Sequence, residues 1–164
     1  MFYYNPNIFP REEYELRKSE NMRFAESVGA DFIDADYDHD IWLEKCAALS
    51  AEPERGGRCL VCFKLRLLKT AQYAAEHGYS VFTTTLSSSR WKCIEQIFEA
   101  GKFAEEIAGP KFWARNWRKG GLTQRRAEIL RERGFYNQQY CGCEFSMRKG
   151  GAAGSDNLAA QTKR

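Results

Sequence analysis

The chain has 164 residues, 43% of them hydrophobic and 14% aromatic, which is enough for one domain with a core of its own. No apolar run is long enough to cross a membrane, and the first residues do not resemble a signal peptide. We therefore expect a cytoplasmic protein without a membrane partner, in which disulfides are rare.

The net charge of +3 is unevenly distributed. Residues 1–56 carry 6 basic and 13 acidic side chains, whereas residues 57–164 carry 19 basic and 9 acidic ones. The second part of the chain therefore favours a polyanionic partner. A solvated basic surface without a partner is the alternative.

Short strands and helices alternate in the first third of the sequence. An apolar run at Phe2–Tyr4 ends at an Asn-Pro-Asn turn and indicates a strand. A helical pattern follows over residues 11–28, and Phe32–Asp34 indicates a second strand. The segment at Asp36–Asp38 is expected to open a second helix through Leu49.

The middle of the chain repeats this order. A strongly amphipathic helix is expected over residues 58–77, followed by a β-branched strand at Ser80–Leu86. Ser87–Ser89 can cap a further helix that runs to about Gly109. A strand, a serine-rich turn and a helix in this order form a natural anion site, because free backbone N–H groups point out of the turn.

This alternation predicts an α/β fold with a parallel sheet. We expect a single metal-binding domain over residues 1–148. The small, polar residues 149–164 are expected to form a disordered tail.

Four of the six cysteines form two close pairs. Cys59 and Cys62 lie where a Gly-Gly loop meets the start of a helix, whose dipole favours thiolates. Cys141 and Cys143 flank a single glycine far downstream. Two such pairs indicate a metal or iron–sulfur site. A structural zinc site and a redox dithiol at the first pair are the alternatives.

The remaining candidate ligands have no such pairing. Cys46 and Cys93 each lie in a predicted helix without a neighbouring cysteine, so both are interpreted as small buried hydrophobic residues. His39 and His77 lie beside helix ends and are interpreted as ordinary surface histidines.

The segment from Lys111 to Arg133 carries 8 basic and 2 acidic residues, interleaved with aromatic side chains. Thr123 is expected to cap a short basic helix within it. Such a segment can bind phosphates and stack on bases. A surface helix with its tryptophans in the core is an equally good interpretation.

Several longer signatures run through residues 2–148. They are Tyr4–Ile8, Glu13-Tyr14, Arg17, Asp36-Tyr37, Trp42, Glu52–Glu54, Gly57–Cys59, Cys62-Phe63, Arg66-Leu67, Thr70-Ala71, Phe82–Leu86, Ser88, Lys92, Tyr136, Gln139–Cys143 and Ser146. With these signatures the chain resembles the QueH-type epoxyqueuosine reductases, which complete queuosine in the anticodon loop of tRNA.

The resemblance implies an adenine-nucleotide-α-hydrolase-like (HUP-type) α/β domain that holds a 4Fe-4S cluster and a second, mononuclear metal ion, iron or zinc. It implies reductive removal of the epoxide oxygen of epoxyqueuosine in tRNA, the last step of queuosine biosynthesis, with electrons from an unidentified donor. The cysteines that match the metal-binding cysteines of the family are Cys59, Cys62, Cys141 and Cys143.

The resemblance also suggests where substrate and tRNA bind. Substrate-binding side chains are expected beside the end of the Phe82 strand, where open α/β sheets bind ligands. These are Asn5, Asn7, Thr84, Thr85, Ser88 and Lys92. Contacts to the tRNA backbone are expected from Lys111, Arg118, Lys119, Arg125 and Arg126.

One departure concerns the first residues. Family members normally begin with a further strand that ends in an adjacent Cys-Cys pair, followed by a helix, whereas this sequence starts on the strand before the Tyr-Asn-Pro-Asn turn. We expect a truncated chain that lacks its first strand and helix and binds its cluster poorly. The alternatives are an inactive fragment of the reductase, a non-catalytic zinc-stabilised RNA-binding module and a thiol–disulfide oxidoreductase.

Overall fold

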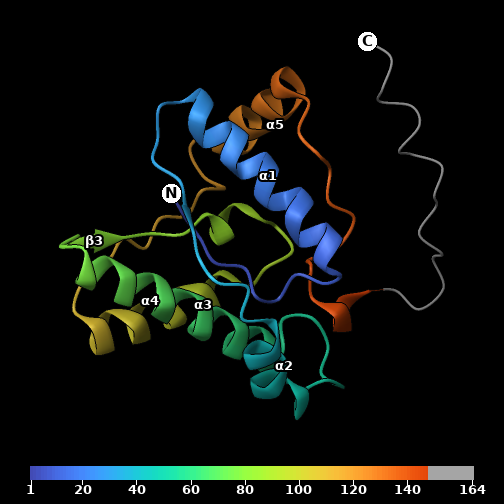
Figure 1. Cartoon of the computed structure of the whole chain (residues 1–164), viewed down its shortest axis with the longest axis vertical. Coiled ribbons are helices and arrows are strands. Elements are labelled where there is room, and N and C mark those ends of the chain that lie inside the picture. The colour runs from blue at the N-terminus through green and yellow to red at the C-terminus, as the bar shows by residue number, and fades with distance from the viewer. Residues whose placement is uncertain (148–164) are drawn as a thin grey trace.

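A computed structural model describes residues 1–147 as a set of α-helices around short parallel strands (Figure 1). The helices are α1 Arg11–Ser27, α2 His39–Ala47, α3 Gly57–Glu76, α4 Ile94–Ala108 and α5 Leu122–Arg133. The strands are β1 Phe2–Tyr3, β2 Ile33–Asp34, β3 Val81–Phe82 and β4 Lys111–Phe112. Short 3-10 helices cover Thr85–Ser88 and Glu144–Ser146. The predicted disordered tail lies outside the described residues.

The strands pair in parallel, as a crossover through a helix requires. Phe2 lies opposite Ile33 in the β1–β2 pair, and Phe82 lies opposite Phe112 in the β3–β4 pair. The predicted α/β class with parallel strands is confirmed. Within residues 1–147 the strands form two separate two-stranded ladders rather than one continuous sheet.

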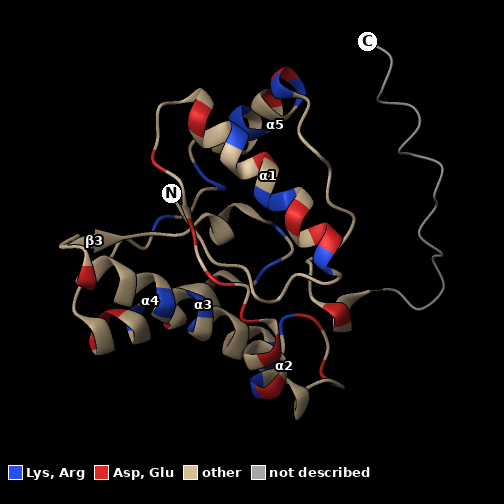
Figure 2. Ribbon diagram, in the orientation of Figure 1, with Lys and Arg blue, Asp and Glu red and all other residues tan. Residues whose placement is uncertain are grey.

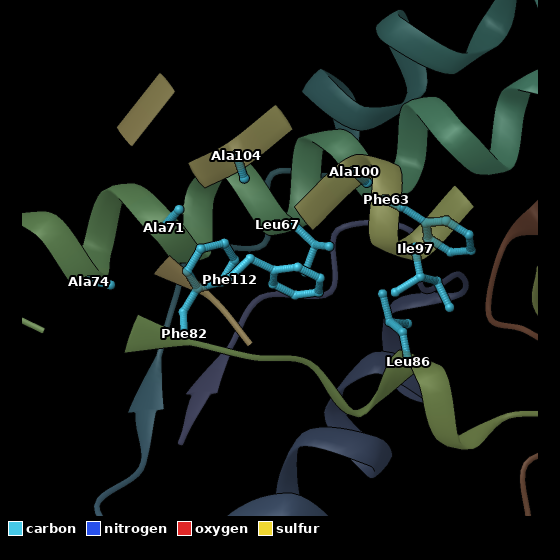
Figure 3. Packing of buried hydrophobic residues seen from close by; sticks show 10 residues of the cluster. All are labelled: Phe63, Leu67, Ala71, Ala74, Phe82, Leu86, Ile97, Ala100, Ala104 and Phe112. Atoms are coloured by element: carbon cyan, nitrogen blue, oxygen red, sulfur yellow. The ribbon is translucent and has the colours of Figure 1, made fainter. Parts of the chain in front are cut away.

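The predicted helix over residues 58–77 is confirmed by α3, and its packing against α4 forms the main core. Buried residues on α3 recur at three- and four-residue spacing and therefore share one face. The cluster consists of Phe63, Leu67, Ala71, Ala74, Phe82, Leu86, Ile97, Ala100, Ala104 and Phe112 (Figure 3). Each large apolar side chain buried in this way stabilises the fold by roughly 1.5–3 kcal/mol.

A second, aromatic cluster packs α1 against the β1–β2 pair. Tyr3, Ile8 and Tyr14 are buried there, with Phe32 and Tyr37 packed against them. None of the helices in residues 1–147 has the length and apolar character needed to cross a lipid bilayer.

The segment after β3 differs from the prediction. The strand is limited to Val81–Phe82, because the Thr84 hydroxyl accepts a hydrogen bond from Leu86 N (3.2 Å) and starts a 3-10 helix. The predicted serine cap is therefore wrong, and α4 begins only at Ile94. The free N–H groups expected at the serine turn do not coincide with a helix start.

The basic segment also differs. Its first residues form the strand β4, which the sequence interpretation missed because two residues are too short to show an alternating pattern. The predicted cap by Thr123 is wrong, because the N-cap of α5 is Gly121 and the Thr123 hydroxyl donates to Arg118 O (3.1 Å). Phe135, just beyond α5, packs edge-on against Phe24 of α1, and the two helices lie side by side in Figure 1.

Candidate functional site

Folding brings the two cysteine pairs together. Cys59 and Cys62 lie in the first turns of α3, whereas Cys141 and Cys143 belong to a loop near the end of the described chain. Cys62 and Cys143 are each only 7% exposed and belong to one buried cluster, and Cys141 packs against that cluster. Cys59 is half-buried and packs against the main α3–α4 core, near enough to Cys141 for the two thiols to influence each other's pKa. That these thiols bind a metal remains a prediction.

Cys46 adds a fifth thiol to this cluster. Its side chain is fully buried, as predicted, but its buried neighbours are Trp42, Cys62 and Cys143. Burial, together with the nearby sulfurs of Cys62 and Cys143, raises the pKa of Cys46 to about 12. Spacing along the sequence could not reveal this position, because α2 meets α3 only in the folded chain.

Cys93 stands apart from the five clustered thiols. It precedes α4 rather than lying within it, and it is half-buried. Its sulfur lies 3.1 Å from a Glu95 carboxylate oxygen, to which the thiol donates a hydrogen bond. Cys93 is therefore a natural control thiol for experiments on the others.

The Cys141–Cys143 loop is held by the Asn5–Pro10 turn and by α1. Gly142 has φ +105°, and a Cβ there would meet Ile8 Cγ1 at 2.9 Å and Arg17 Nη1 at 3.0 Å, so only glycine fits without displacement. Phe9 N donates to Gly142 O (2.9 Å). The Arg17 guanidinium donates to Cys141 O (3.2 Å) and Tyr140 O (3.1 Å).

Arg17 is itself positioned by a carboxylate. Glu13, one turn earlier on α1, lies 2.7 Å from the guanidinium, and both side chains are largely buried. Tyr136 donates a hydrogen bond to Glu13 (2.9 Å). A chain of polar contacts therefore runs from Tyr136 through Glu13 and Arg17 to the backbone of Cys141.

The first cysteine pair is held by the loop before α3. Glu52 accepts hydrogen bonds from the backbone N–H groups of Gly57 and Arg58 at the start of the helix. The buried guanidinium of Arg58 donates back to Ser50 O (2.7 Å) and Glu52 O (2.6 Å). Arg55 N donates to the sulfur of Cys59 (3.3 Å).

The expectation that the helix dipole favours thiolates at the first pair is wrong for this geometry. Burial raises the pKa of Cys59 and Cys62, and it raises that of Cys143 to about 11. The Glu52 carboxylate already occupies the positive end of α3, so the helix dipole is largely offset there.

Cys141 is the exception among the thiols. Burial alone would raise its pKa, but the Lys92 ammonium, 3.2 Å from the sulfur, together with the Cys143 N–H and Arg66, lowers the pKa below its usual value. Cys141 is therefore the thiol best prepared to act as a thiolate ligand or nucleophile.

Three cations lie near the thiols. Besides Lys92, Arg66 contributes to the lowered pKa of Cys141 and partly opposes the rise at Cys62, and Arg58 partly opposes the rise at Cys46, Cys59 and Cys143. None of these three cations forms an ion pair within residues 1–147. Such an environment is suited to a group with net negative charge.

Four cysteine sulfurs are the donor chemistry of a thiolate-bound metal group, either an iron–sulfur cluster or a zinc ion. In the described part of the chain, no three His, Cys, Asp or Glu side chains gather closely enough to hold one metal ion. Which group the four predicted cysteines hold remains a prediction.

The predicted substrate residues differ in how close they lie to the thiols. Lys92 contacts a thiol directly. Asn5 accepts a hydrogen bond from Arg66, and Asn7 lies against Gly142 in the cysteine loop. Asn7 is 2% exposed, and its Oδ1 has no hydrogen-bond donor among residues 1–147. These residues are brought to the thiols from the start and the middle of the chain.

The other three predicted substrate residues share the turn after β3. Thr84 uses its hydroxyl to cap the 3-10 helix, so that oxygen is already engaged. Thr85 is exposed and Ser88 is half-buried. Their role in substrate binding remains a prediction.

Of the five predicted tRNA-binding cations, one is held by hydrogen bonds to the backbone and four are exposed. The half-buried Arg118 donates to Ser87 O (3.0 Å) and Lys92 O (2.8 Å), so its side chain stabilises the loop before α4. The other four are exposed, on β4, on α5 and in the loop between them (Figure 2). Lys111 pairs with Glu105, Arg125 pairs with Glu128, and Lys119 and Arg126 form no ion pair within residues 1–147.

Comparison with known proteins gives a consistent result. The family model described as "Epoxyqueuosine reductase QueH" matches residues 1–149. Proteins of that name from Histophilus somni and Haemophilus influenzae are 50% and 48% identical to the chain over 149 residues. Each match covers 90% of this chain and 61% of the relative. A Thermotoga maritima protein of the same name is 36% identical, with 89% of this chain and 78% of the relative covered.

Proposed function

Because this chain belongs to the epoxyqueuosine reductase QueH family, we propose that it carries the thiol site for reduction of epoxyqueuosine to queuosine in tRNA. The observation that carries the proposal is the meeting of both cysteine pairs near Lys92, Arg58 and Arg66, none of which forms an ion pair within residues 1–147. The chain spans about three fifths of its first two relatives, 61% of each, so the activity is proposed for the protein to which these residues belong.

The proposed reaction removes the epoxide oxygen from the cyclopentane ring. Both carbon–oxygen bonds break, a carbon–carbon double bond forms, and the oxygen leaves as water with two protons. Two electrons balance the step, and they come from an external low-potential one-electron donor. The site must therefore deliver electrons and protons to the same small volume.

We assign Cys59, Cys62, Cys141 and Cys143 as the residues that would hold a 4Fe-4S cluster. Such a cluster supplies electrons one at a time and is tuned by charges and hydrogen bonds around its thiolates. Arg58 and Arg66 compensate the negative charge of those thiolates. No step is assigned to the second metal ion, because the described residues offer no set of ligands for it.

Lys92 and Asn7 are the proposed substrate contacts closest to the thiols. The ammonium of Lys92 has three N–H donors, and the sulfur of Cys141 takes one of them. Another can donate to the epoxide oxygen and supply a proton as the carbon–oxygen bond breaks. The buried Oδ1 of Asn7 is unpaired in the described residues, so a hydroxyl or amine of the substrate would relieve its desolvation.

The experiment is an anaerobic reaction of the reconstituted protein with tRNA that carries epoxyqueuosine, with dithionite as the electron source. Iron, sulfide and zinc are measured beside the visible spectrum, and nucleosides are analysed by mass spectrometry. We expect a brown protein and loss of one oxygen atom from the modified nucleoside. Cys62→Ser and Cys141→Ser should abolish both, whereas Cys93→Ser should retain both.

Two results would contradict the proposal. Bound zinc without sulfide, together with tRNA binding but no loss of oxygen, would support a zinc-stabilised RNA-binding module. Activity on dithiol substrates in a metal-free protein would support a thiol–disulfide oxidoreductase.

A further inference from the structure

The loop between the 3-10 helix Thr85–Ser88 and α4 presents the most exposed tryptophan of residues 1–147. Trp91 has 65% of its surface accessible, and the guanidinium of Arg90 lies over its ring at 4.7 Å from the ring centre. A single exposed apolar side chain needs no explanation. Here, however, the indole combines with three further features of the loop.

The first feature is a rigid backbone beneath the indole. Arg55 donates from Nε to Trp91 O (3.0 Å) and from a terminal nitrogen to Arg90 O (3.1 Å). Arg118 donates to Lys92 O (2.8 Å). Three consecutive carbonyl groups are therefore held by guanidinium groups, so the exposed ring stands on a fixed support.

The second feature is the conformation of Arg55. Its φ is +70°, in the left-handed region that a non-glycine residue occupies at a cost of roughly 1–2 kcal/mol. Glycine would remove that strain but would also remove both contacts to the Trp91 loop. Since Arg55 N also donates to the sulfur of Cys59 (3.3 Å), one residue ties the loop to a predicted metal ligand.

The third feature is that Trp91 is followed directly by a residue of the thiol site. The residue that follows Trp91 is Lys92, whose ammonium contacts the sulfur of Cys141. Adjacent Cα atoms are about 3.8 Å apart, so the exposed indole begins one residue from a side chain that touches the thiol site. The loop therefore connects the exposed indole directly to a residue of the thiol site.

The charge of the loop indicates which class of partner it binds. Residues 85–94 contain Arg90 and Lys92 and no Asp or Glu, and the exposed Arg55 adds a further cation. An exposed aromatic ring among cations is the arrangement by which proteins bind unpaired nucleotides, because the ring stacks on a base and the cations contact phosphates.

We propose that Trp91 is a stacking platform for an unpaired base of the RNA substrate, next to the nucleotide that enters the thiol site. Arg55 is a positioning residue that fixes this platform relative to Cys59. The inference rests on the proposed function for the identity of the RNA. It names a residue outside the Lys111–Arg133 segment, which the sequence had indicated as the RNA contact.

The test is binding of a fluorescently labelled anticodon stem-loop RNA, measured by anisotropy without reductant. Stacking on an aromatic side chain is worth about 1–3 kcal/mol per base, so Trp91→Ala should weaken binding about ten-fold or more, and Trp91→Phe should restore most of it. Tyr79→Ala is the matched control, because Tyr79 is also an exposed aromatic residue (57%) but precedes β3 and lies outside both the Trp91 loop and the predicted tRNA-binding segment. It should change affinity by less than about three-fold.

Salt dependence separates stacking from charge. Trp91→Ala should leave the slope of binding against salt unchanged, whereas Arg90→Gln should reduce it by about one unit. Arg55→Gly should weaken binding in the same direction as Trp91→Ala, because the support beneath the ring is lost. Circular dichroism would establish that each variant is folded.

Several outcomes would overturn the proposal. These are wild-type binding by Trp91→Ala, an equal loss of affinity in Tyr79→Ala, an equal loss of affinity of Trp91→Ala for a perfectly paired RNA duplex, and no measurable binding by the unaltered chain. The result is distinguishable from failure of the proposed function. Loop-specific RNA binding that depends on Trp91 without epoxide reduction would refute the reductase alone, and reduction by Trp91→Ala at the wild-type rate would refute the platform alone.

Discussion

Replacing Arg17 by methionine tests whether α1 positions the second cysteine pair. The side chain of Arg17 is 9% exposed, pairs with the 12% exposed Glu13 and donates to the carbonyl groups of Tyr140 and Cys141. A methionine fills most of the volume but makes none of these contacts. The variant therefore removes the polar connection while keeping much of the packing.

The expected loss of stability follows from these contacts. A hydrogen bond from a charged donor contributes about 1.5–3 kcal/mol, and removal of one partner of a buried ion pair costs about 3–5 kcal/mol. The two terms overlap, because both describe the loss of the same guanidinium, so we expect Arg17→Met to lose about 3–5 kcal/mol. Small domains are stable by about 5–15 kcal/mol, so the variant should remain foldable.

Urea denaturation followed by tryptophan fluorescence measures this loss. Arg23→Met is the matched control on the same helix, because Arg23 is 61% exposed in its pair with Glu20. The control should lose less than about 1 kcal/mol. Under native conditions Arg17→Met should also increase alkylation of Cys141, because its loop is no longer held. Equal stability losses in Arg17→Met and Arg23→Met, with unchanged alkylation of Cys141, would refute the reasoning.

Three further predictions concern the site and the core. Lys92→Gln removes the ammonium that lowers the pKa of Cys141, so less thiolate should be present and iodoacetamide should alkylate Cys141 more slowly at pH 8; an unchanged rate would contradict this. Gly101→Ala places a Cβ against the ring of Phe112 and should lose about 1–3 kcal/mol in urea denaturation despite the higher helix propensity of alanine, and Phe112→Leu in the same chain should reduce that loss. The Phe112 N–H and neighbouring lysines lower the pKa of Glu105 to about 2 from 4.5, so its contribution to stability is present above about pH 4.5 and is lost as the pH falls through about 2. Glu105→Gln should accordingly lower the melting temperature at pH 7 and have little effect near pH 2, and the same decrease at both pH values would argue against this linkage.

Local sequence patterns were sufficient to predict several helices and strands. The helices α1 and α3 and the strand β1 were predicted within one or two residues, because apolar periodicity and turn residues are local signals. The strand β4 was not predicted, because a two-residue strand shows no periodicity. The late start of α4 was not predicted either, because the serine turn before it is shaped by contacts such as the hydrogen bond from Ser87 to Arg115 O (2.6 Å). Such contacts join segments that are far apart in the sequence.

The same distinction applies to the site. The sequence by itself determined that Cys59, Cys62, Cys141 and Cys143 form two close pairs, because their spacing and glycine neighbours are read directly from the chain. Only the tertiary structure decided that Cys46 joins them, that Lys92 acts on Cys141 and that burial outweighs the helix dipole at the first pair. The physical reason is that desolvation and Coulomb interactions depend on distance in space, which α2, α3 and the Cys141 loop acquire only when they pack together.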